Sequence, residues 1–315
     1  METSTSKKQS QLLDELKDIS TESQNQNTLD IDLLETQNIL EKINFEDHKI
    51  APVIKNIIPQ IANAVDEIVK AFAQGGRLIY IGAGTSGRLG ILDAVECPPT
   101  FSVSSDKVIG IIAGGQNAIY KAVEGAEDNE NEALKDLQKI SLSDKDVLVG
   151  VAASGRTPYV ISAMKYGKSI GSTVVGISCS YNENFAKAND INLCAVVGAE
   201  VLTGSTRMKS GTAQKLILNM LSTASMIRSG KSYKNLMIDV NASNEKLYAR
   251  AIRIVMQATD CTFDCAKSAL KESNNNAKLA TLMVLTGLNV AQSIDCLANN
   301  DGFLRKAVEQ INTNS

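Results

Sequence analysis

The chain has 315 residues and is 43% hydrophobic, which is enough for one large domain or for a large and a small one. Its 32 basic and 35 acidic residues nearly balance, so charge gives no basis for binding nucleic acid or an anionic membrane. A single histidine, His48, excludes triads that need two histidines and argues against a histidine-rich metal site.

The first thirty residues are polar, and no apolar run reaches 18 residues, so we expect no signal peptide and no membrane span. The six cysteines form no C-x-x-C pair; four of them lie in apolar or helical contexts, where we expect buried free thiols. These features predict a cytoplasmic protein.

The N-terminal part of the chain predicts a polar segment followed by two helices. Residues 1–29 are rich in Ser, Thr, Gln, Asn and Lys, so we expect them to be mobile or draped over the surface. Apolar residues on one side predict a helix over 30–43, and a period near 3.6 predicts a longer one from about Val53 to Ala73. Gly75-Gly76 should end it.

Short, continuously apolar runs then alternate with helical patterns. The predicted strands are Arg77–Gly82, Val108–Ala113, Asp146–Ala152, Thr173–Ser178 and Leu193–Val197. Buried strands separated by crossover helices indicate a doubly wound α/β fold, a parallel sheet with helices on both faces. Ligands of such sheets bind beyond the carboxyl ends of the strands.

The C-terminal part of the chain has a purely helical pattern. The predicted helices span 244–258, 263–272, 276–286, 290–298 and 301–311. We therefore expect a polar N-terminal segment (1–29), an α/β domain with N-terminal helices (30–258) and a small all-helical module (259–315). For the module itself we expect a packing or dimerisation role.

The turn after the first strand predicts an anion-binding cradle. Leu78–Ile81 is a buried strand, and Gly82, Gly84 and Gly87 break the pattern before a helix starts, so backbone N–H groups can approach a ligand. The glycine spacing fits neither a dinucleotide fingerprint nor a nucleotide P-loop. The hydroxyls of Thr85 and Ser86 suit a sugar phosphate instead, although a merely tight turn is the alternative.

Two further turns resemble the first. The third predicted strand leads into Ser154-Gly155-Arg156-Thr157, which repeats the Ser-Gly-Arg of residues 86–88 just before a helix. Two such turns on one sheet could converge on one phosphate. A third hydroxyl-rich turn, residues 200–212, contains Ser205 and Thr206 with an arginine and a lysine; the alternative there is an N-capped helix with solvated cations.

Two carboxylates stand out by position. Glu96 lies about two turns into the helix that follows the first turn, directly before Cys97-Pro98-Pro99, which should end that helix. Glu127 follows the second predicted strand and its glycine turn. Two carboxylates with differently tuned pKa values can run acid and base chemistry without histidine or metal, whereas solvated helix-end carboxylates are the alternative.

Long motifs in this order resemble the N-acetylmuramic acid 6-phosphate etherase family over residues 18–312. They are the first turn with its Glu96–Thr100 tail, Ala122–Asp128, Ala152–Val160, Gly198–Lys215 and the N-terminal stretch Ser20–Asp32. The resemblance implies a sugar isomerase (SIS) domain followed by a ubiquitin-associated-like module. It also implies a homodimer, no metal or cofactor, and cleavage of a lactyl ether during recycling of cell-wall amino sugars.

Residue by residue, the resemblance implies roles for several side chains. Glu96 matches the family's proton donor and Glu127 its second catalytic glutamate, while Lys246 matches a functional lysine or is a solvated helix-start lysine. The positions that match or flank the phosphate loops are Thr85, Ser86, Ser154, Arg156, Thr157, Ser205 and Thr206.

The implied chemistry agrees with the residues. A base can remove the C2 hydrogen of the open-chain sugar, lactate leaves C3 with a proton from an acid, and water adds back. We assign the acid to Glu96 and the base to Glu127, with the reverse assignment left open. The alternatives are an SIS-type sugar-phosphate isomerase and a non-catalytic sugar-phosphate sensor; a transcriptional regulator would need a basic helix-turn-helix, which residues 1–52 lack.

Overall fold

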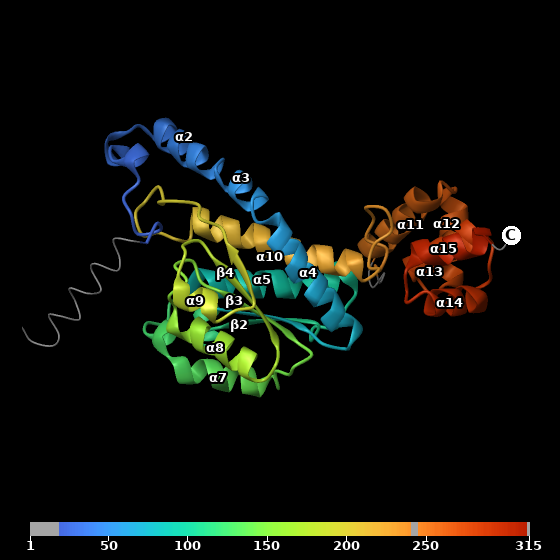
Figure 1. The fold of residues 1–315 in the computed structure, drawn as a ribbon. Helices are drawn as coiled ribbons and strands as arrows, with labels where there is room; N and C mark the ends of the chain where they lie inside the picture. Colours follow the sequence, from blue (N-terminus) through green and yellow to red (C-terminus); the bar gives the residue numbers. More distant parts are fainter. Residues whose placement is uncertain (1–18, 241–244, 314–315) are drawn as a thin grey trace, which may run out of the picture. The chain divides into compact units, whose positions relative to one another are not determined.

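The computed structural model of the chain describes residues 19–240 and 245–313 (Figure 1). They form two compact units, each described by itself. The first consists of the described residues up to Ala94 and Asp106–Ser222; the second consists of Val95–Ser105 and the described residues from Thr223 onward. The domain boundary expected near residue 258 stays a prediction.

The first unit is built on a sheet of five parallel strands. The strands are β1 (Leu78–Gly82), β2 (Val108–Ile112), β3 (Val147–Val151), β4 (Thr173–Ser178) and β5 (Ile191–Cys194). Their order is β2-β1-β3-β4-β5, so the winding direction reverses between β1 and β3. The predicted doubly wound fold is confirmed, and the reversal places the ligand crevice outside the carboxyl ends of β1 and β3.

One strand prediction was displaced. β5 starts at Ile191 and ends at Cys194, whereas the sequence analysis expected Leu193–Val197. The reason is the length of its neighbour, since β4 ends at Ser178, which pairs with Cys194. β4 ends at this pair, so the residues after Cys194 have no further strand residues of β4 to pair with.

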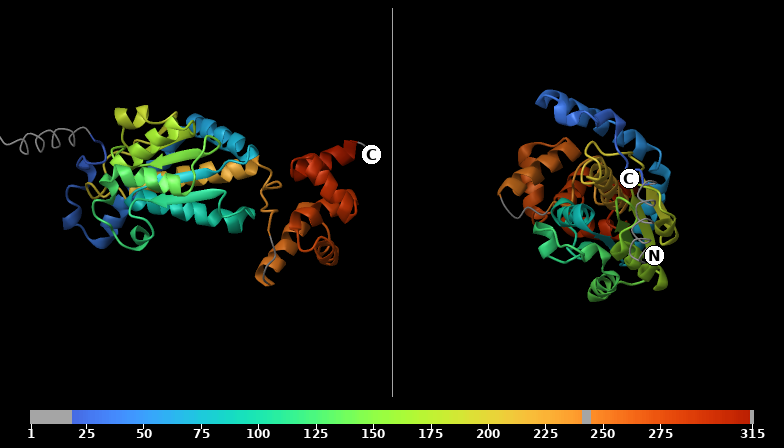
Figure 2. Two further views of the ribbon diagram at one scale, coloured as in Figure 1. Left: turned by 90° about the horizontal axis from the view of Figure 1, so that it is seen from below. Right: turned by 90° about the vertical axis from the view of Figure 1, so that its left-hand side faces the viewer.

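Helices cover both faces of the sheet (Figures 1 and 2). On one face, α7 (Glu130–Lys139) and α8 (Pro158–Ser169) share a buried cluster with Ile79 and Ile81 of β1. On the other face lies α5 (Gly84–Phe101), where Gly90 packs against Tyr80. Successive side chains of β1 thus pack against helices on opposite faces of the sheet, which explains why its sequence is apolar throughout.

The N-terminal helices differ from the prediction in one respect. Instead of one helix from Val53 to Ala73 there are two, α3 (Ile50–Lys55) and α4 (Ile58–Ala73). The break has a cause in the sequence, because Pro59 in the first turn of α4 lacks the N–H that a continuous helix would need. The helix expected over 30–43 is present as α2 (Thr36–Asp47), and a 3₁₀ turn (Ile31–Leu33) takes the place of its expected start.

Helix α5 does not end at its two prolines, as the sequence analysis expected. It continues to Phe101 with Pro98 and Pro99 inside its last turn. At this position the two prolines remove only the donors that would reach the carbonyls of Ala94 and Val95. The helix ends at Ser102, whose φ is 49° and whose N–H donates to the carbonyl of Pro98 over 2.9 Å.

The second unit contains the predicted C-terminal helices almost residue for residue. They are α11 (Glu245–Thr259), α12 (Phe263–Glu272), α13 (Ala277–Thr286), α14 (Val290–Asn299) and α15 (Leu304–Thr313). α13 lies at the centre, with most of its residues buried among the other four helices. Asn276 and Asn289 cap α13 and α14, and Gly287 at φ 71° ends α13, so local signals fix these boundaries.

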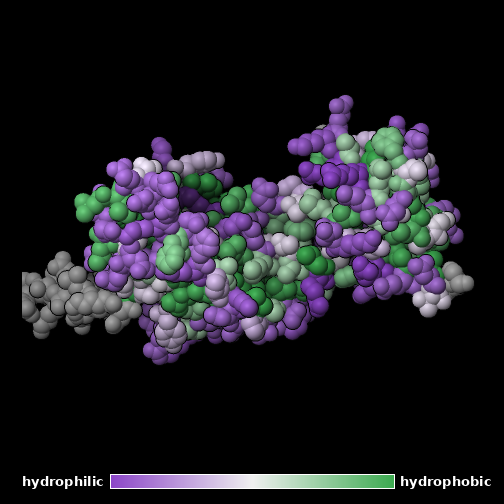
Figure 3. All heavy atoms as spheres, turned by 90° about the horizontal axis from the view of Figure 1, so that it is seen from above, coloured by the Kyte–Doolittle hydropathy of each residue, from purple (hydrophilic) through white to green (hydrophobic). Residues whose placement is uncertain are grey.

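Within the described residues, no single helix has both the length and the apolar composition of a membrane span. The bent pair Ala277–Thr286 and Val290–Ala298 satisfies these criteria only when taken together, on length and composition alone. Some large apolar side chains of the first unit are exposed, including Leu33 and Phe45, and Figure 3 shows apolar residues scattered among hydrophilic ones on one face.

Candidate functional site

The carboxyl end of β1 passes directly into the N-terminus of α5. A Cβ on Gly82 would lie 2.7 Å from the backbone nitrogen of Gly87, so only glycine lets the helix start this close to the strand. Thr85 and Ser86 lie in the first turn of α5, where free backbone N–H groups favour an anion. Ser86-Gly87-Arg88 is therefore inside the helix, and not in a turn before it as expected.

The third predicted turn joins this cradle through α10 (Lys209–Arg228). Ser86 Oγ donates a 2.9 Å hydrogen bond to Oε1 of Gln214, and a Cβ on Gly211 would lie 3.5 Å from the Thr85 side chain. Gln214 is buried, and its Nε2 has no hydrogen-bond partner among the described residues. Gln214 was not among the predicted site residues, although its position, about one turn after a hydroxyl-rich helix start, indicated a place near the cradle.

The second Ser-Gly-Arg turn leaves β3, the neighbour of β1. Ser154 and Arg156 lie in the loop before α8, and Gly155 has a φ of 67° that favours glycine. Ser154 Oγ accepts a hydrogen bond from the backbone N–H of Arg156 at 3.3 Å. Thr157 precedes Pro158 at the start of α8, and its hydroxyl does not cap that helix. Both loops therefore lie at the switch point of the sheet.

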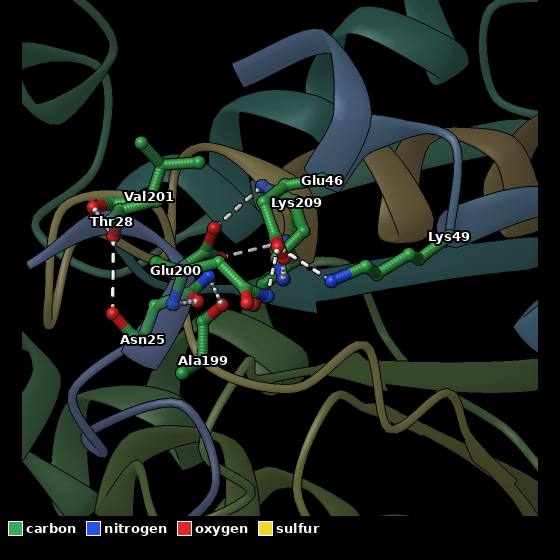
Figure 4. Close-up of polar contacts among 10 residues, drawn as sticks. Asn25, Thr28, Glu46, Lys49, Ala199, Glu200, Val201 and Lys209 are labelled. Atoms are coloured by element: carbon green, nitrogen blue, oxygen red, sulfur yellow. Dashed lines mark hydrogen bonds and ion pairs between the residues drawn. The ribbon is translucent and has the colours of Figure 1, made fainter. Parts of the chain in front are cut away.

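The residues between β5 and α10 form a loop held by one buried carboxylate. Glu200 accepts hydrogen bonds from the backbone N–H groups of Lys209 and Ser210, both at 2.9 Å, and from Ser210 Oγ at 2.8 Å (Figure 4). A carboxylate at a helix N-terminus is favoured by the free donors and by the helix dipole. The loop that Glu200 closes contains Ser205 and Thr206, both half-buried.

Lys209, the lysine of the third predicted turn, is buried, so the alternative prediction of a solvated cation is wrong for this residue. Lys209 Nζ lies 2.7 Å from Oε2 of Glu46 on α2, and the two side chains are 2% and 1% exposed (Figure 4). Burial opposes ionisation of Glu46, but hydrogen bonds from Lys209, Lys49 and Asn27 outweigh it and lower its pKa to about 2. A buried ion pair thus ties α2 to the start of α10.

The described part of the N-terminal segment is partly buried, whereas we expected it to be mobile or draped over the surface. Asn25 Nδ2 donates to the carbonyl of Ala199 at 3.1 Å, and Thr28 Oγ1 donates to that of Val201 at 2.9 Å. Asn25 and Thr28 are buried, and these contacts hold the loop residues on either side of Glu200 (Figure 4). Residues 1–18 lie outside the described residues.

A cavity of about 240 Å³ adjoins the cradle at the carboxyl ends of β1 and β2. Its charged lining residues are Arg88, Glu124 and Glu127, and its small ones include Ala83 and Gly84 of the cradle. Arg88 Nε donates to the carbonyl of Ile119 at 3.0 Å, which holds the guanidinium at the cavity. Arg88 was predicted only as part of a repeated motif, although a cation one turn after a phosphate loop indicates a ligand contact.

The remaining candidates are exposed. Glu127, at the rim of the cavity, lies in a 3₁₀ turn (Ala126–Asp128) that follows Gly125 at φ 71°. Glu96 is exposed on α5, eleven residues after Thr85, and Lys246 is exposed in the first turn of α11 in the second unit. Among the described residues, no three Cys, His, Asp or Glu side chains cluster closely enough to hold a metal ion.

A doubly wound parallel sheet with hydroxyl-bearing loops at its switch point defines the class of SIS-domain proteins. Three family models agree: the N-terminal SIS domain of glucokinase regulatory protein matches residues 60–168, the SIS domain matches 121–224, and the C-terminal lid domain of glucokinase regulatory protein matches 234–308.

Curated relatives match almost the whole chain. The N-acetylmuramic acid 6-phosphate etherase of Colwellia psychrerythraea is 70% identical over 302 residues, covering 96% of this chain and 98% of the relative. N-acetylmuramic acid 6-phosphate etherase 2 of Vibrio cholerae is 58% identical, covering 95% and 97%. The chain belongs to the N-acetylmuramic acid 6-phosphate etherase family.

Proposed function

We propose that the protein is a carbon–oxygen lyase that cleaves the C3 lactyl ether of N-acetylmuramic acid 6-phosphate. The products are N-acetylglucosamine 6-phosphate and D-lactate. The observation that carries the proposal is the 70% identity to an etherase over 96% of the chain. The hydroxyl-lined loops and the carboxylate-lined cavity at one edge of the sheet agree with such a substrate.

The phosphate is proposed to bind at the switch point of the sheet. Donors for its oxygens are the free N–H groups of the first turn of α5 and the hydroxyls of the adjacent loops. The proposed phosphate and sugar contacts are Thr85, Ser86, Ser154, Arg156, Thr157, Ser205 and Thr206. The sugar then extends from the cradle into the neighbouring cavity, because Gly84 belongs to both.

The reaction is proposed to be an elimination followed by an addition. Glu127 removes the C2 proton of the open-chain sugar, which is acidic because C2 is bonded to the C1 aldehyde. The electron pair forms the C2–C3 double bond, the C3–O bond breaks, and Glu96 gives its proton to the leaving lactate oxygen. Water then adds to C3, and a proton returns to C2.

Two measurements test the proposal. The protein incubated with N-acetylmuramic acid 6-phosphate should release D-lactate, whereas a sugar-phosphate isomerase or a non-catalytic sensor would release none. In ¹⁸O-water the new C3 hydroxyl of the amino sugar should contain the label. Label in lactate would contradict the elimination and show attack on the lactyl carbon instead.

Four finer assignments complete the proposal. We propose a homodimer, which light scattering during gel filtration would test, and a cytoplasmic location, which the six free cysteines of the described structure support. Lys246 is proposed to assist the reaction, so Lys246→Met should slow lactate release. The chain is proposed to consist of an α/β domain over 30–258 and a helical module over 259–315.

A further inference from the structure

The hydroxyl of Ser86 in the phosphate cradle is bonded to helix α10. Its Oγ donates a 2.9 Å hydrogen bond to Oε1 of Gln214, and the two residues are 8% and 1% exposed. Helices α5 and α10 lie close together at this level, since a Cβ on Gly211 would lie 3.5 Å from the Thr85 side chain. The hydrogen bond therefore joins the proposed phosphate cradle to a buried amide.

The direction of this hydrogen bond does not suit a phosphate ligand. The oxygens of a phosphate dianion accept hydrogen bonds, and a serine hydroxyl has a single proton to donate. With that proton directed at Gln214, Ser86 Oγ can offer a ligand only its lone pairs, which repel a phosphate oxygen. The O–H of Ser86 must therefore turn away from Gln214 before it can donate to a phosphate.

The amide of Gln214 is incompletely bonded in the same arrangement. Its Nε2 is buried and has no hydrogen-bond partner among the residues that the structure describes. A buried N–H group without a partner has lost its hydration and gained no bond in return, which costs free energy. If the Ser86 hydroxyl turned to a phosphate and the amide stayed in place, Oε1 would lose its hydrogen bond from Ser86 as well.

Rotation of the amide resolves both conflicts. The two ends of a glutamine amide have nearly the same size, so a half-turn about the terminal torsion exchanges Oε1 and Nε2 with little change in packing. Nε2 then donates to Ser86 Oγ, and the Ser86 hydroxyl is free to donate to a phosphate oxygen. Each hydrogen bond in such a chain polarises the next and strengthens it.

We propose that Gln214 is a positioning residue that reverses its hydrogen bond to Ser86 when phosphate binds. The inference rests on the proposed function, which places a sugar phosphate at Ser86, and it adds a residue that acts through Ser86 and not on the ligand. The reversal gives the buried Nε2 a partner. Oε1 loses its partner in exchange, but an unpaired carbonyl is better tolerated in protein interiors than an unpaired N–H.

Replacing the amide by a carboxylate of the same shape tests the reversal. Gln214→Glu can accept from Ser86 but cannot donate to it, because the Ser86 hydroxyl and the free N–H groups at the start of α5 favour the ionised form. The Ser86 proton should then stay on the carboxylate. Calorimetric titration with N-acetylglucosamine 6-phosphate at pH 8 measures the effect of Ser86→Ala in each background.

The effect of Ser86→Ala is expected to depend on the background. It should weaken binding about fivefold in the wild type and less than about twofold in Gln214→Glu, where the hydroxyl gives the phosphate nothing that the substitution could remove. In Gln214→Met the side chain accepts no proton, so Ser86→Ala should again weaken binding about fivefold. Gln138→Glu, the same change at an exposed position of α7, is the matched control and should bind as wild type does.

Two results of these titrations would overturn the proposal. One is an equal effect of Ser86→Ala in the wild-type and Gln214→Glu backgrounds, as repulsion by the added charge alone would give. The other is the absence of an effect in Gln214→Met, which would show disturbed packing. Failure of the proposed function is seen separately, because wild type would release no D-lactate while the titrations still report on Gln214. Wild type that does not bind the sugar phosphate would overturn both.

Nuclear magnetic resonance of the amide gives a second measurement. In protein labelled with ¹⁵N-glutamine, the side-chain signal of Gln214 is the one that disappears in Gln214→Met. Saturation with N-acetylglucosamine 6-phosphate should move one of its amide protons downfield, as a new hydrogen bond does, and Ser86→Ala should abolish this shift. A signal that does not move, or a shift that persists without the Ser86 hydroxyl, would contradict the proposal.

Discussion

Replacing Glu46 by glutamine should destabilise the first unit strongly, because it leaves a buried ammonium without its counter-charge. Lys209 is 2% exposed and its amino group lies 2.7 Å from the Glu46 carboxylate. Glutamine keeps the size of the side chain and can still accept a hydrogen bond, so the change removes charge and little packing. Breaking a buried ion pair in this way costs about 3–5 kcal/mol of the free energy of unfolding.

The pKa of Glu46 gives a second, independent magnitude. Burial opposes its ionisation, yet hydrogen bonds from Lys209, Lys49 and Asn27 lower the pKa from 4.5 to about 2. A pKa shift of this size corresponds to about 3 kcal/mol of the free energy of unfolding. The contribution is smaller than this because Lys49 is 40% exposed and solvent screens its charge. The stabilisation is present above pH 4.5 and is lost as the pH falls from 4.5 toward 2.

Urea unfolding followed by far-UV circular dichroism at pH 7 measures the loss, and repeating it between pH 5 and pH 3 measures the linkage. Glu46→Gln should unfold at lower urea and should lose part of the wild-type pH dependence. Glu46→Gln with Lys209→Met should be more stable than Glu46→Gln alone, since no buried charge is left unpaired. Glu67→Gln, which breaks an exposed pair with Lys70, is the control and should cost about 0.5 kcal/mol or less. A cost for Glu46→Gln as small as that of the control would refute the reasoning.

Three further outcomes follow from the site and from the cysteines. Arg88→Gln should raise KM for N-acetylmuramic acid 6-phosphate about tenfold in lactate-release assays, because it removes the cation from a cavity that two glutamates line; an unchanged KM would contradict this role. Ser86→Ala should weaken inorganic phosphate binding about fivefold by calorimetry, since it removes a hydroxyl from the first turn of α5; unaltered binding would show that Ser86 is not a phosphate ligand. A disulfide reagent at pH 8 should modify exposed Cys265 first and leave Cys179 intact, because burial raises the pKa of Cys179 to about 12; mass spectrometry of peptides would reveal any early modification of Cys179.

The parts of the fold that were predictable are those set by local sequence. The strands are continuous apolar runs, and the C-terminal helices begin at side chains that cap them, such as Asn276 and Asn289. The break before Pro59 could also have been predicted, because proline removes a helix donor. The apolar period continues across the break, however, and therefore favoured a single helix. The spacing of apolar residues predicts which face of a helix is buried, but it does not predict where a helix is interrupted for a single turn.

The unpredicted features depend on contacts between distant parts of the chain. Glu46 and Lys209 are 163 residues apart, and neither has a neighbour in sequence that marks it as buried. Ser86 and Gln214 are likewise 128 residues apart, and their hydrogen bond joins the first turn of α5 to α10. No local pattern in the sequence predicts such a contact.

The hydrogen bonds of the N-terminal segment also constrain how the first unit folds. Asn25 and Thr28 bond to residues that follow them by 174 and 173 positions. Contacts of such long range close large loops and form slowly, and synthesis from the N-terminus delays them further because their partners are made much later. Residues 25–28 therefore leave the ribosome long before β5 and α10 exist to receive them. In native-state hydrogen exchange, we expect this segment to open at a lower free energy than β1 and β3.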